Sequence, residues 1–108
     1  EPNKFTIAPS KAIKELALKT DSNLEDIDLF EINEAFSMVP IVNTNILSLD
    51  DKKVNINGGA VSLGHPLGCS GARILTTLIH SLHRLKKKKG IAAICNGGGG
   101  ASSVQIKI

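Results

Sequence analysis

Apolar side chains recur along this chain with two different spacings, and these predict a mixture of helices and strands. Residues 11–20, 37–49 and 66–89 place apolar side chains every three or four positions, as helices with one buried face do. Residues 27–32 and 101–108 alternate apolar with polar side chains, and 91–94 is a short apolar run, as strands require. The order of these segments predicts an α/β fold.

Proline and glycine mark where the predicted elements begin and end. Pro40 lies inside the second helical pattern, so this helix either starts late, near Ser37, or is kinked. Pro66 suits the start of the third helix, and Gly90 is expected to end it. The four glycines at 97–100 predict an antiparallel hairpin between the last two strands.

Composition narrows the function classes. The chain has 108 residues, 42% of them hydrophobic, which suffices for one aliphatic core. The formal charge of +3 owes much to the lysines at 86–89, which we interpret as a solvated turn after a helix. No Tyr or Trp is present to stack on bases, and no zinc-ligand spacing occurs, so nucleic-acid binding is not expected.

Two cysteines are too few for a disulfide framework and are not spaced as a metal motif, which favours a reducing compartment. No apolar stretch is long enough to cross a bilayer, and the first residues lack the apolar segment of a signal peptide. We therefore expect the cytoplasm or a mitochondrion, with no membrane partner and no secretion.

Two side chains are candidates for chemistry on local grounds. His65 lies between Gly64 and Pro66 beside a helix start, where free amides and the helix dipole favour anions. Cys95 ends an apolar strand and precedes glycines, whose bare backbone admits a close ligand. Taken alone, each residue favours a structural interpretation, as a hydrogen-bonding histidine or a small core cysteine. Cys69 is interpreted as a packing residue.

Three segments together resemble one known family. NEAF at 33–36, NGGAVSLGHPLGCSGAR at 57–73 and CNGGGGAS at 95–102 are similar to the asparagine, histidine and cysteine loops of thiolases, in the same order and with similar spacing. The resemblance covers nearly the whole chain, which is similar to the C-terminal part of a thiolase. It implies a thiolase-like C-terminal domain with a mixed sheet, residues 1–108 forming one partial domain that lacks its first strand and leaves a sheet edge unpaired.

The resemblance also implies roles for individual residues. The histidine matching His65 activates a nucleophilic cysteine and holds a thioester oxygen, and the cysteine matching Cys95 moves a proton at the substrate α-carbon. Gly97 matches a glycine whose amide forms part of an oxyanion hole, and Asn33 matches an asparagine that positions a water. Two residues, Ala35 and Phe36, match the lining of the pantetheine tunnel, although Phe36 would serve equally well as core.

The implied activity is that of an acyltransferase in lipid metabolism. A whole protein of this type interconverts two acetyl-CoA with acetoacetyl-CoA and CoA by ping-pong cysteine acyl transfer, and assembles as a homodimer or homotetramer. Neither Cys69 nor Cys95 occupies the motif of the cysteine that is acylated, so we expect that residue in a missing N-terminal half and expect the isolated chain to be inactive. In potassium-dependent members the carbonyl matching Val61 binds K⁺.

Three other interpretations stay open. Asn96 departs from the aliphatic residue that many thiolases carry, but the whole segment CNGGGGAS resembles the acetoacetyl-CoA branch, which leaves degradative thiolases of broader chain length as the first alternative. A non-catalytic acyl-CoA- or lipid-binding homologue is the second, against which Asn33, His65 and Cys95 argue. A dinucleotide-binding loop is disfavoured, because no Gly-x-Gly-x-x-Gly lies between an early strand and a helix.

The catalytic assignment makes a geometric prediction. Proton transfer works only within hydrogen-bond reach or through one water. Asn33, His65 and the segment 95–97 should therefore converge on one side of the sheet.

Overall fold

A three-stranded mixed sheet lies at the centre of the molecule. The computed structural model describes all residues, 1–108. The strands are β1 (Leu29–Ile32), β2 (Lys89–Cys95) and β3 (Ala101–Lys107), in the order β1-β2-β3. β1 and β2 are parallel, with Ile32 opposite Ala93, whereas β2 and β3 are antiparallel, with Cys95 opposite Ala101. The α/β class, the mixed sheet and the hairpin are confirmed.

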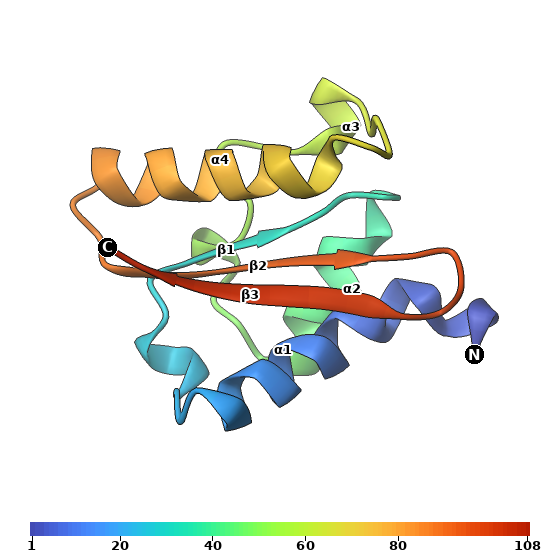
Figure 1. Ribbon diagram of the computed structural model, residues 1–108, viewed down its shortest axis with the longest axis horizontal. Coiled ribbons are helices and arrows are strands. Elements are labelled where there is room, and N and C mark those ends of the chain that lie inside the picture. Colours follow the sequence, from blue (N-terminus) through green and yellow to red (C-terminus); the bar gives the residue numbers. More distant parts are fainter.

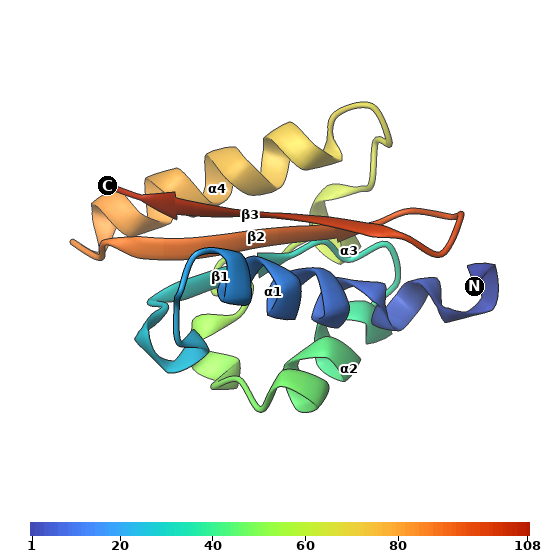
Figure 2. The same cartoon turned by 60° about the horizontal axis from the view of Figure 1, so that its bottom comes forward.

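Helices cover both faces of this sheet (Figure 1). α4 lies along one face, and α1 and α2 lie on the other, as a second view also shows (Figure 2). The helices are α1 (Ala8–Lys19), α2 (Met38–Leu47), α3 (Ala60–Leu63) and α4 (Ser70–Arg84). Short 3₁₀ segments occupy Pro2–Ile7, Leu24–Asp26 and Asp51–Lys53.

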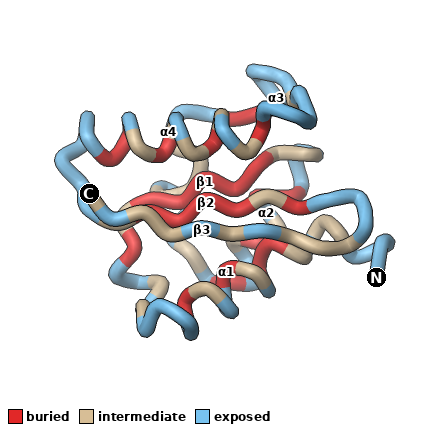
Figure 3. The backbone as a smooth tube through the Cα atoms, in the orientation of Figure 1, coloured by how far each residue is buried: buried red, intermediate tan, exposed pale blue.

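The alternation of strand side chains divides the interior into two hydrophobic cores. The larger, on the α1 and α2 face, contains Ile13, Phe30, Ile32, Val39, Ile91, Ala93 and Cys95 among its buried members. The smaller, under α4, contains Leu29, Ala92, Ile74, Leu78 and Leu82. β1 and β2 are buried along most of their length, and β3 is half-exposed (Figure 3). The apolar run predicted the burial of β2, and the alternating run at 101–108 predicted the half-exposed β3. The alternating run at 27–32 was misleading, because β1 is buried on both faces, Glu31 included.

The outer edge of β1 is covered by a side chain, whereas the outer edge of β3 has no neighbouring strand. The side chain of Asn55 covers the outer edge of β1, since its Oδ1 accepts from Ile32 N and its Nδ2 donates to Ile32 O, both at 2.8 Å. Asn55 N also donates to Phe30 O at 2.9 Å. β3 forms the other edge and has no strand on its outer side, as expected of an unpaired edge.

Pro40 is accommodated by a late helix start. α2 begins at Met38, after Ser37, so Pro40 occupies the first turn, where backbone N–H groups have no intrahelical acceptor. The proline therefore removes no helical hydrogen bond. This confirms the first of the two alternatives that the sequence allowed.

The expected bounds of the third helix are wrong at both ends. α4 begins at Ser70, because residues 66–69 form a turn in which Cys69 N and Ser70 N both donate to Pro66 O. It ends at Arg84, before Lys86 takes a left-handed conformation with φ 54°. Gly90 instead belongs to β2, where an added Cβ would meet Leu78 Cδ1 at 2.7 Å. Close packing of α4 on the sheet, rather than helix termination, is why glycine is needed there.

The lysine run has the position expected of a solvated turn. Lys86, Lys87 and Lys88 are exposed between α4 and β2. None of the helices has the length and apolar character that crossing a bilayer demands.

Candidate functional site

A pocket of about 620 Å³ opens at the carboxyl end of the parallel strands. It collects residues from the N-terminal 3₁₀ segment, the loop after β1, the loop before α4 and the β2–β3 hairpin. Its lining residues are Phe5, Ala35, Phe36, His65, Leu67, Ile94, Cys95, Asn96, Gly97 and Ser102. Five of the residues singled out from the sequence, His65, Cys95, Gly97, Ala35 and Phe36, are thus brought to one cavity.

Cys95 is the last residue of β2 and reaches the pocket from the sheet. It is 8% exposed and belongs to the larger core. Burial raises the pKa of its thiol, outweighing the opposing effect of a backbone hydrogen bond. Because a neutral thiol is favoured, Cys95 is suited in this state to donating a proton to a carbon next to it.

The side chain of Asn96 shapes the glycine turn beside that thiol. Its Oδ1 accepts from Gly98 N at 3.0 Å and from Gly100 N at 3.2 Å, while Asn96 N donates to Gly100 O. Gly97 is exposed, and its own N–H has no acceptor within the chain. The turn therefore presents one unpaired amide at the pocket, as an oxyanion-binding donor requires. The sequence marked Asn96 only as a departure from many thiolases and missed this contact.

His65 is held by a hydroxyl from the first turn of α4. Its Nδ1 lies 2.5 Å from Ser70 Oγ, and Ser70 is only 1% exposed. The same Oγ donates to Pro66 O at 3.1 Å. Since a hydroxyl has one proton and a carbonyl only accepts, Ser70 Oγ accepts from Nδ1–H of His65. In the neutral imidazole this contact leaves the lone pair on Nε2, which is the arrangement of a base. The sequence motif contained Ser70 but did not identify this contact.

Asn33 also lies at the carboxyl end of the parallel strands, but its side chain is on the sheet face opposite to that of Cys95. Its N–H donates to Ala93 O at 2.9 Å, which places it directly after the β1–β2 pairing. Its side chain faces α4, where Oδ1 accepts from Arg73 Nη2 at 3.4 Å, whereas Cys95 belongs to the core on the opposite face. Convergence on a single side of the sheet is therefore wrong for Asn33. Residues that follow parallel strands meet at an edge even when their side chains alternate between faces.

Asn33 does not cap a helix, the common structural role of an asparagine that precedes one. Ser37 precedes α2, and the Asn33 side chain is fully buried, with Nδ2 lacking any hydrogen-bond partner. A buried amide left half unpaired is uncommon in proteins and calls for an explanation.

The NEAF loop and the histidine loop are joined by Glu34. Its Oε2 accepts from Val61 N at 2.8 Å, at the start of α3. A Cβ on Gly59 would lie 2.7 Å from the Glu34 carboxyl carbon, so the carboxylate reaches this amide only because residue 59 is glycine. The contact holds the loop that carries His65 against the loop that carries Asn33.

The apolar wall of the pocket comes from two distant segments. Phe36 is 59% exposed, so it is not a core residue, and its ring packs against Phe5 with centroids 5.9 Å apart. Ala35 lies beside it in the lining. Phe5 was missed from the sequence, because no local pattern links the N-terminal segment to this cavity.

The remaining expectations concern Cys69 and Val61. Cys69 is exposed, so its interpretation as a packing residue is wrong: the turn at 66–69 turns it away from the core. Val61 lies in α3 with 67% of its surface exposed. No three His, Cys, Asp or Glu side chains are grouped so as to hold a metal ion, and K⁺ at the Val61 carbonyl stays a prediction through which no chemical step is drawn.

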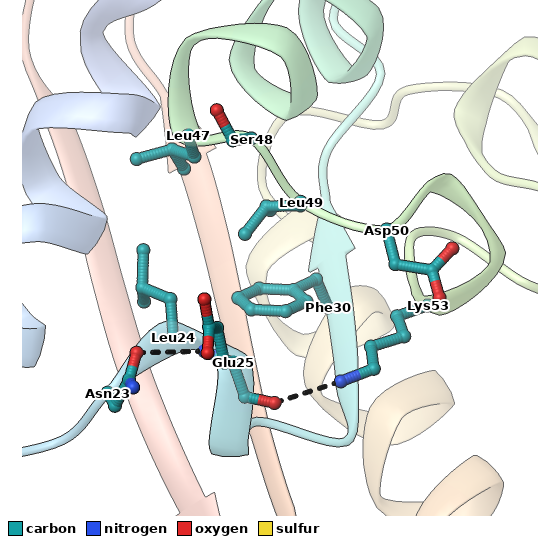
Figure 4. Close-up of a pocket in the computed structure, with 9 residues that line it drawn as sticks. All are labelled: Asn23, Leu24, Glu25, Phe30, Leu47, Ser48, Leu49, Asp50 and Lys53. Atoms are coloured by element: carbon teal, nitrogen blue, oxygen red, sulfur yellow. Dashed lines mark hydrogen bonds between the residues drawn. The ribbon is translucent and has the colours of Figure 1, made fainter.

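A second pocket of about 440 Å³ lies away from these residues (Figure 4). Phe30, Leu47 and Leu49 form its apolar side. Lys53 Nζ donates to Glu25 O at its rim. None of the residues singled out from the sequence lines it, and its Lys53 and Asp50 side chains are engaged in loop contacts.

Comparison with known proteins gives the family. The sequence model of the thiolase C-terminal domain matches residues 1–108. Acetyl-CoA acetyltransferase of Saccharomyces cerevisiae is 59% identical over 110 residues, which cover 99% of this chain and 27% of that protein. The chain thus spans about a quarter of the length of such curated relatives.

Comparison with solved structures also identifies thiolases. Acat5 thiolase from Ascaris suum, determined in complex with coenzyme A, is 53% identical with a TM-score of 0.93, over 99% of this chain and 28% of that one. Human mitochondrial 3-ketoacyl-CoA thiolase is 42% identical with a TM-score of 0.95, over 99% of this chain and 27% of that one. The match over every residue, the thiolase architecture and the three loops together show that the chain belongs to the thiolase family, within its C-terminal domain.

Proposed function

We propose that this chain supplies the proton-transfer half of a thiolase active site that interconverts two acetyl-CoA with acetoacetyl-CoA and CoA. One observation carries the proposal: His65, Cys95 and Gly97 line a single pocket although up to 32 positions separate them. A base, a thiol and an unpaired amide around one cavity are the parts that Claisen-type acyl chemistry needs.

Cys95 is the proton carrier of the proposed reaction. In the cleavage direction a thiolate outside these residues attacks the 3-keto carbon, and the bond between C2 and C3 breaks. Its electron pair stays on C2 of the departing acetyl-CoA, which takes the proton of Cys95 Sγ. The incoming CoA thiol then receives the acyl group, and its proton restores Cys95. The pKa raised by burial keeps Cys95 protonated at the start of this sequence.

His65, Asn33 and Gly97 stabilise oxygen atoms. Nε2 of His65 serves the attacking thiol as a base, and in its protonated form donates to a thioester oxygen together with a water held by Asn33. The free N–H of Gly97 donates to the oxyanion of the acyl intermediate. Ala35 and Phe36, with Phe5, provide the apolar wall for the pantetheine arm.

The substrate pair is acetyl-CoA and acetoacetyl-CoA. The relative named acetyl-CoA acetyltransferase is 59% identical, against 42% for the 3-ketoacyl-CoA thiolase. A degradative thiolase of broader chain length is the second candidate, favoured by the higher TM-score of that neighbour, 0.95. The non-catalytic homologue loses ground because His65, Cys95 and Gly97 share one pocket.

The rest of the enzyme belongs to the proposal too. The relatives are almost four times as long as this segment, and neither cysteine here matches the acylated one, so the nucleophile is assigned to an N-terminal half. We treat residues 1–108 as one partial domain of a homodimer or homotetramer in the cytoplasm or mitochondrion. K⁺ near Val61 would be a further ligand.

Turnover is tested in the longest natural chain that contains these residues, called the parent chain below. Thiolysis of acetoacetyl-CoA by CoA is followed for the wild type, for Cys95→Ala and for Cys69→Ser as the matched exposed control. We expect Cys95→Ala to lose turnover and Cys69→Ser to keep it. A wild type that binds acetyl-CoA but shows no turnover would favour the non-catalytic homologue. A wild type that prefers long 3-ketoacyl-CoA substrates would favour the degradative thiolase.

The segment alone gives a second test. Residues 1–108 incubated with acetoacetyl-CoA and CoA should form no acetyl-CoA, and intact-mass spectrometry should find no acetyl group on Cys95. Stoichiometric acetylation of Cys95 with sustained product formation would mean that this segment carries its own nucleophile, which contradicts the division of roles.

A further inference from the structure

Three polar side chains, those of Glu31, Asn33 and Arg73, lie together between β1 and α4. Glu31 is 2% exposed and Asn33 fully buried, and only 18% of the Arg73 side chain is exposed. Each keeps one atom without a hydrogen bond: Glu31 Oε2, Asn33 Nδ2 and Arg73 Nη1. Glu31 Oε2 and Arg73 Nη1 face each other as an ion pair at 3.6 Å, which leaves Asn33 Nδ2 as the atom with no partner. Buried polar groups are nearly always paired, so this free amide marks a place shaped by something other than stability.

Arg73 links the other two side chains. Glu31 and Asn33 are two positions apart, so their side chains leave the strand on the same face, toward α4. Arg73, in the first turns of α4, donates from Nη2 to Asn33 Oδ1 at 3.4 Å and places Nη1 3.6 Å from Glu31 Oε2. Both contacts use one rigid guanidinium fork.

The chemistry of the guanidinium decides which way the amide faces. A guanidinium only donates, so Asn33 can meet it only through Oδ1. The Nδ2 group is then directed elsewhere and keeps its two protons for another acceptor, consistent with its lack of any partner within the chain. Without Arg73 nothing in the chain distinguishes this orientation of the amide from the flipped one.

We propose that Arg73 is a positioning residue, which fixes the Asn33 amide with Nδ2 free to donate, and that Glu31 balances the buried charge of Arg73. This inference rests on the proposed function, in which Asn33 holds a water for the thioester oxygen. Arg73 itself touches no substrate. A lysine would retain the charge but not the fork, so it would hold Asn33 or Glu31 but not both in the present geometry.

A double-mutant cycle in the parent chain separates positioning from general support of the fold. Arg73→Met should lower kcat about 10- to 100-fold with KM little changed, the scale of a lost hydrogen bond to a charged group. In an Asn33→Ala background the same change should lower kcat less than about threefold, because the residue through which it acts is gone. Arg73→Lys should recover only part of the loss. Equal losses in both backgrounds would overturn the inference.

Arg84 is the matched control. It is the arginine at the other end of α4, and it also donates from Nη2 to an asparagine, Asn57 Oδ1, at 2.9 Å. Arg84→Met removes the same kind of bond outside the pocket and should leave kcat unchanged. A comparable loss in this variant would mean that any arginine on α4 matters, which contradicts a specific role for Arg73.

Crystal structures of the parent chain and of its Arg73→Met and Arg84→Met variants test the orientation of Asn33 directly, with no measurement of enzymatic rate. The Asn33 side chain should leave its wild-type rotamer in Arg73→Met and stay in Arg84→Met. An unmoved Asn33 in Arg73→Met overturns the inference. A wild type without thiolase turnover, combined with a displaced Asn33, would instead contradict the proposed function and leave the positioning role supported.

Discussion

The two ends of the β1–β2 pair use polar groups in opposite ways. At the amino end, Asp28 Oδ2 accepts from Lys88 N and Lys89 N, both at 2.9 Å, and Oδ1 lies 3.9 Å from Lys87 Nζ. These backbone donors lower the pKa of Asp28, with the Lys87 charge adding to them against the effect of burial. Both carboxylate oxygens are engaged, and the contact fastens the start of β2 to the residue before β1.

The carboxyl end leaves polar groups unpaired. Glu31 Oε2, Asn33 Nδ2 and the N–H of Gly97 make no hydrogen bond within the chain, although Glu31 Oε2 lies 3.6 Å from Arg73 Nη1. Burial raises the pKa of Glu31 to about 7 despite the Arg73 charge, and it also raises the pKa of Cys95. An unpaired buried group costs about 1–3 kcal/mol, so this end gives up stability that the other end keeps. Polar residues of one sheet thus stabilise the fold at one end and remain free for other partners at the opposite end.

The largest effect on activity is expected from His65→Ala, at the carboxyl end, in the parent chain. Loss of general acid–base help should slow acyl transfer about 10²–10⁴-fold while CoA binding persists. Steady-state rates and a CoA titration by calorimetry measure the two quantities. Asp28→Asn, at the other end, should leave the rate within a factor of about two. A similar loss from Asp28→Asn would show that the two ends are not separate in function.

Next in size is the pH dependence that Glu31 imposes on stability. Its pKa of about 7 in the folded chain lies above the ordinary 4.5, so the folded state binds the proton more tightly and stability falls as pH rises between these values. The loss amounts to about 3 kcal/mol at most. Thermal unfolding of the parent chain should give a Tm advantage over Glu31→Gln at pH 5 that shrinks or reverses by pH 8. Parallel Tm curves would contradict it.

Asp28→Ala should destabilise the fold, because Asp28 joins the start of β2 to the residue before β1. Two backbone N–H groups lose their carboxylate acceptor, which should lower the free energy of unfolding by about 1–3 kcal/mol. Because the folded pKa of Asp28 is lowered, its contribution is present above pH 3.8 and disappears as pH falls through the folded value. Urea unfolding at pH 7 measures the loss. Lys86→Ala, an exposed change in the same turn, is the control and should have little effect.

The smallest effect is expected from Ser70→Ala, which tests whether Ser70 orients His65 at the carboxyl end. The variant loses the acceptor for His65 Nδ1–H, so the imidazole is free to change tautomer and to rotate. The rate in the parent chain should fall about 3- to 30-fold, the scale of one hydrogen bond. Ser70→Thr keeps the hydroxyl and should recover most of it. An unchanged rate in Ser70→Ala would mean that another group orients His65.

Most secondary structure followed from local patterns. The spacing of apolar residues predicted α1, β1, β2 and β3, because each element must bury one face and the period of that face is a property of the backbone. Pro40 correctly indicated a late start for α2, since its effect on a helix is also local. The resemblance of three loops to thiolases placed His65, Cys95 and Gly97 in one site, and they line one pocket.

Errors arose where the deciding contact was distant in sequence. Gly90 was expected to end a helix, yet it is glycine because Leu78 packs on a strand. Cys69 was expected to pack, yet the turn before α4 leaves it exposed. Neither outcome can be inferred from neighbouring residues.

The sequence by itself determined the alternation of helices and strands, the family and the residues that carry the proposed chemistry. Only the packing of distant elements brought the Asn33 side chain to the α4 face, Ser70 Oγ to His65 Nδ1 and Arg73 Nη2 to Asn33 Oδ1. Periodicity is encoded in consecutive residues, whereas hydrogen bonds between side chains 5 to 40 positions apart depend on where packing brings two elements together.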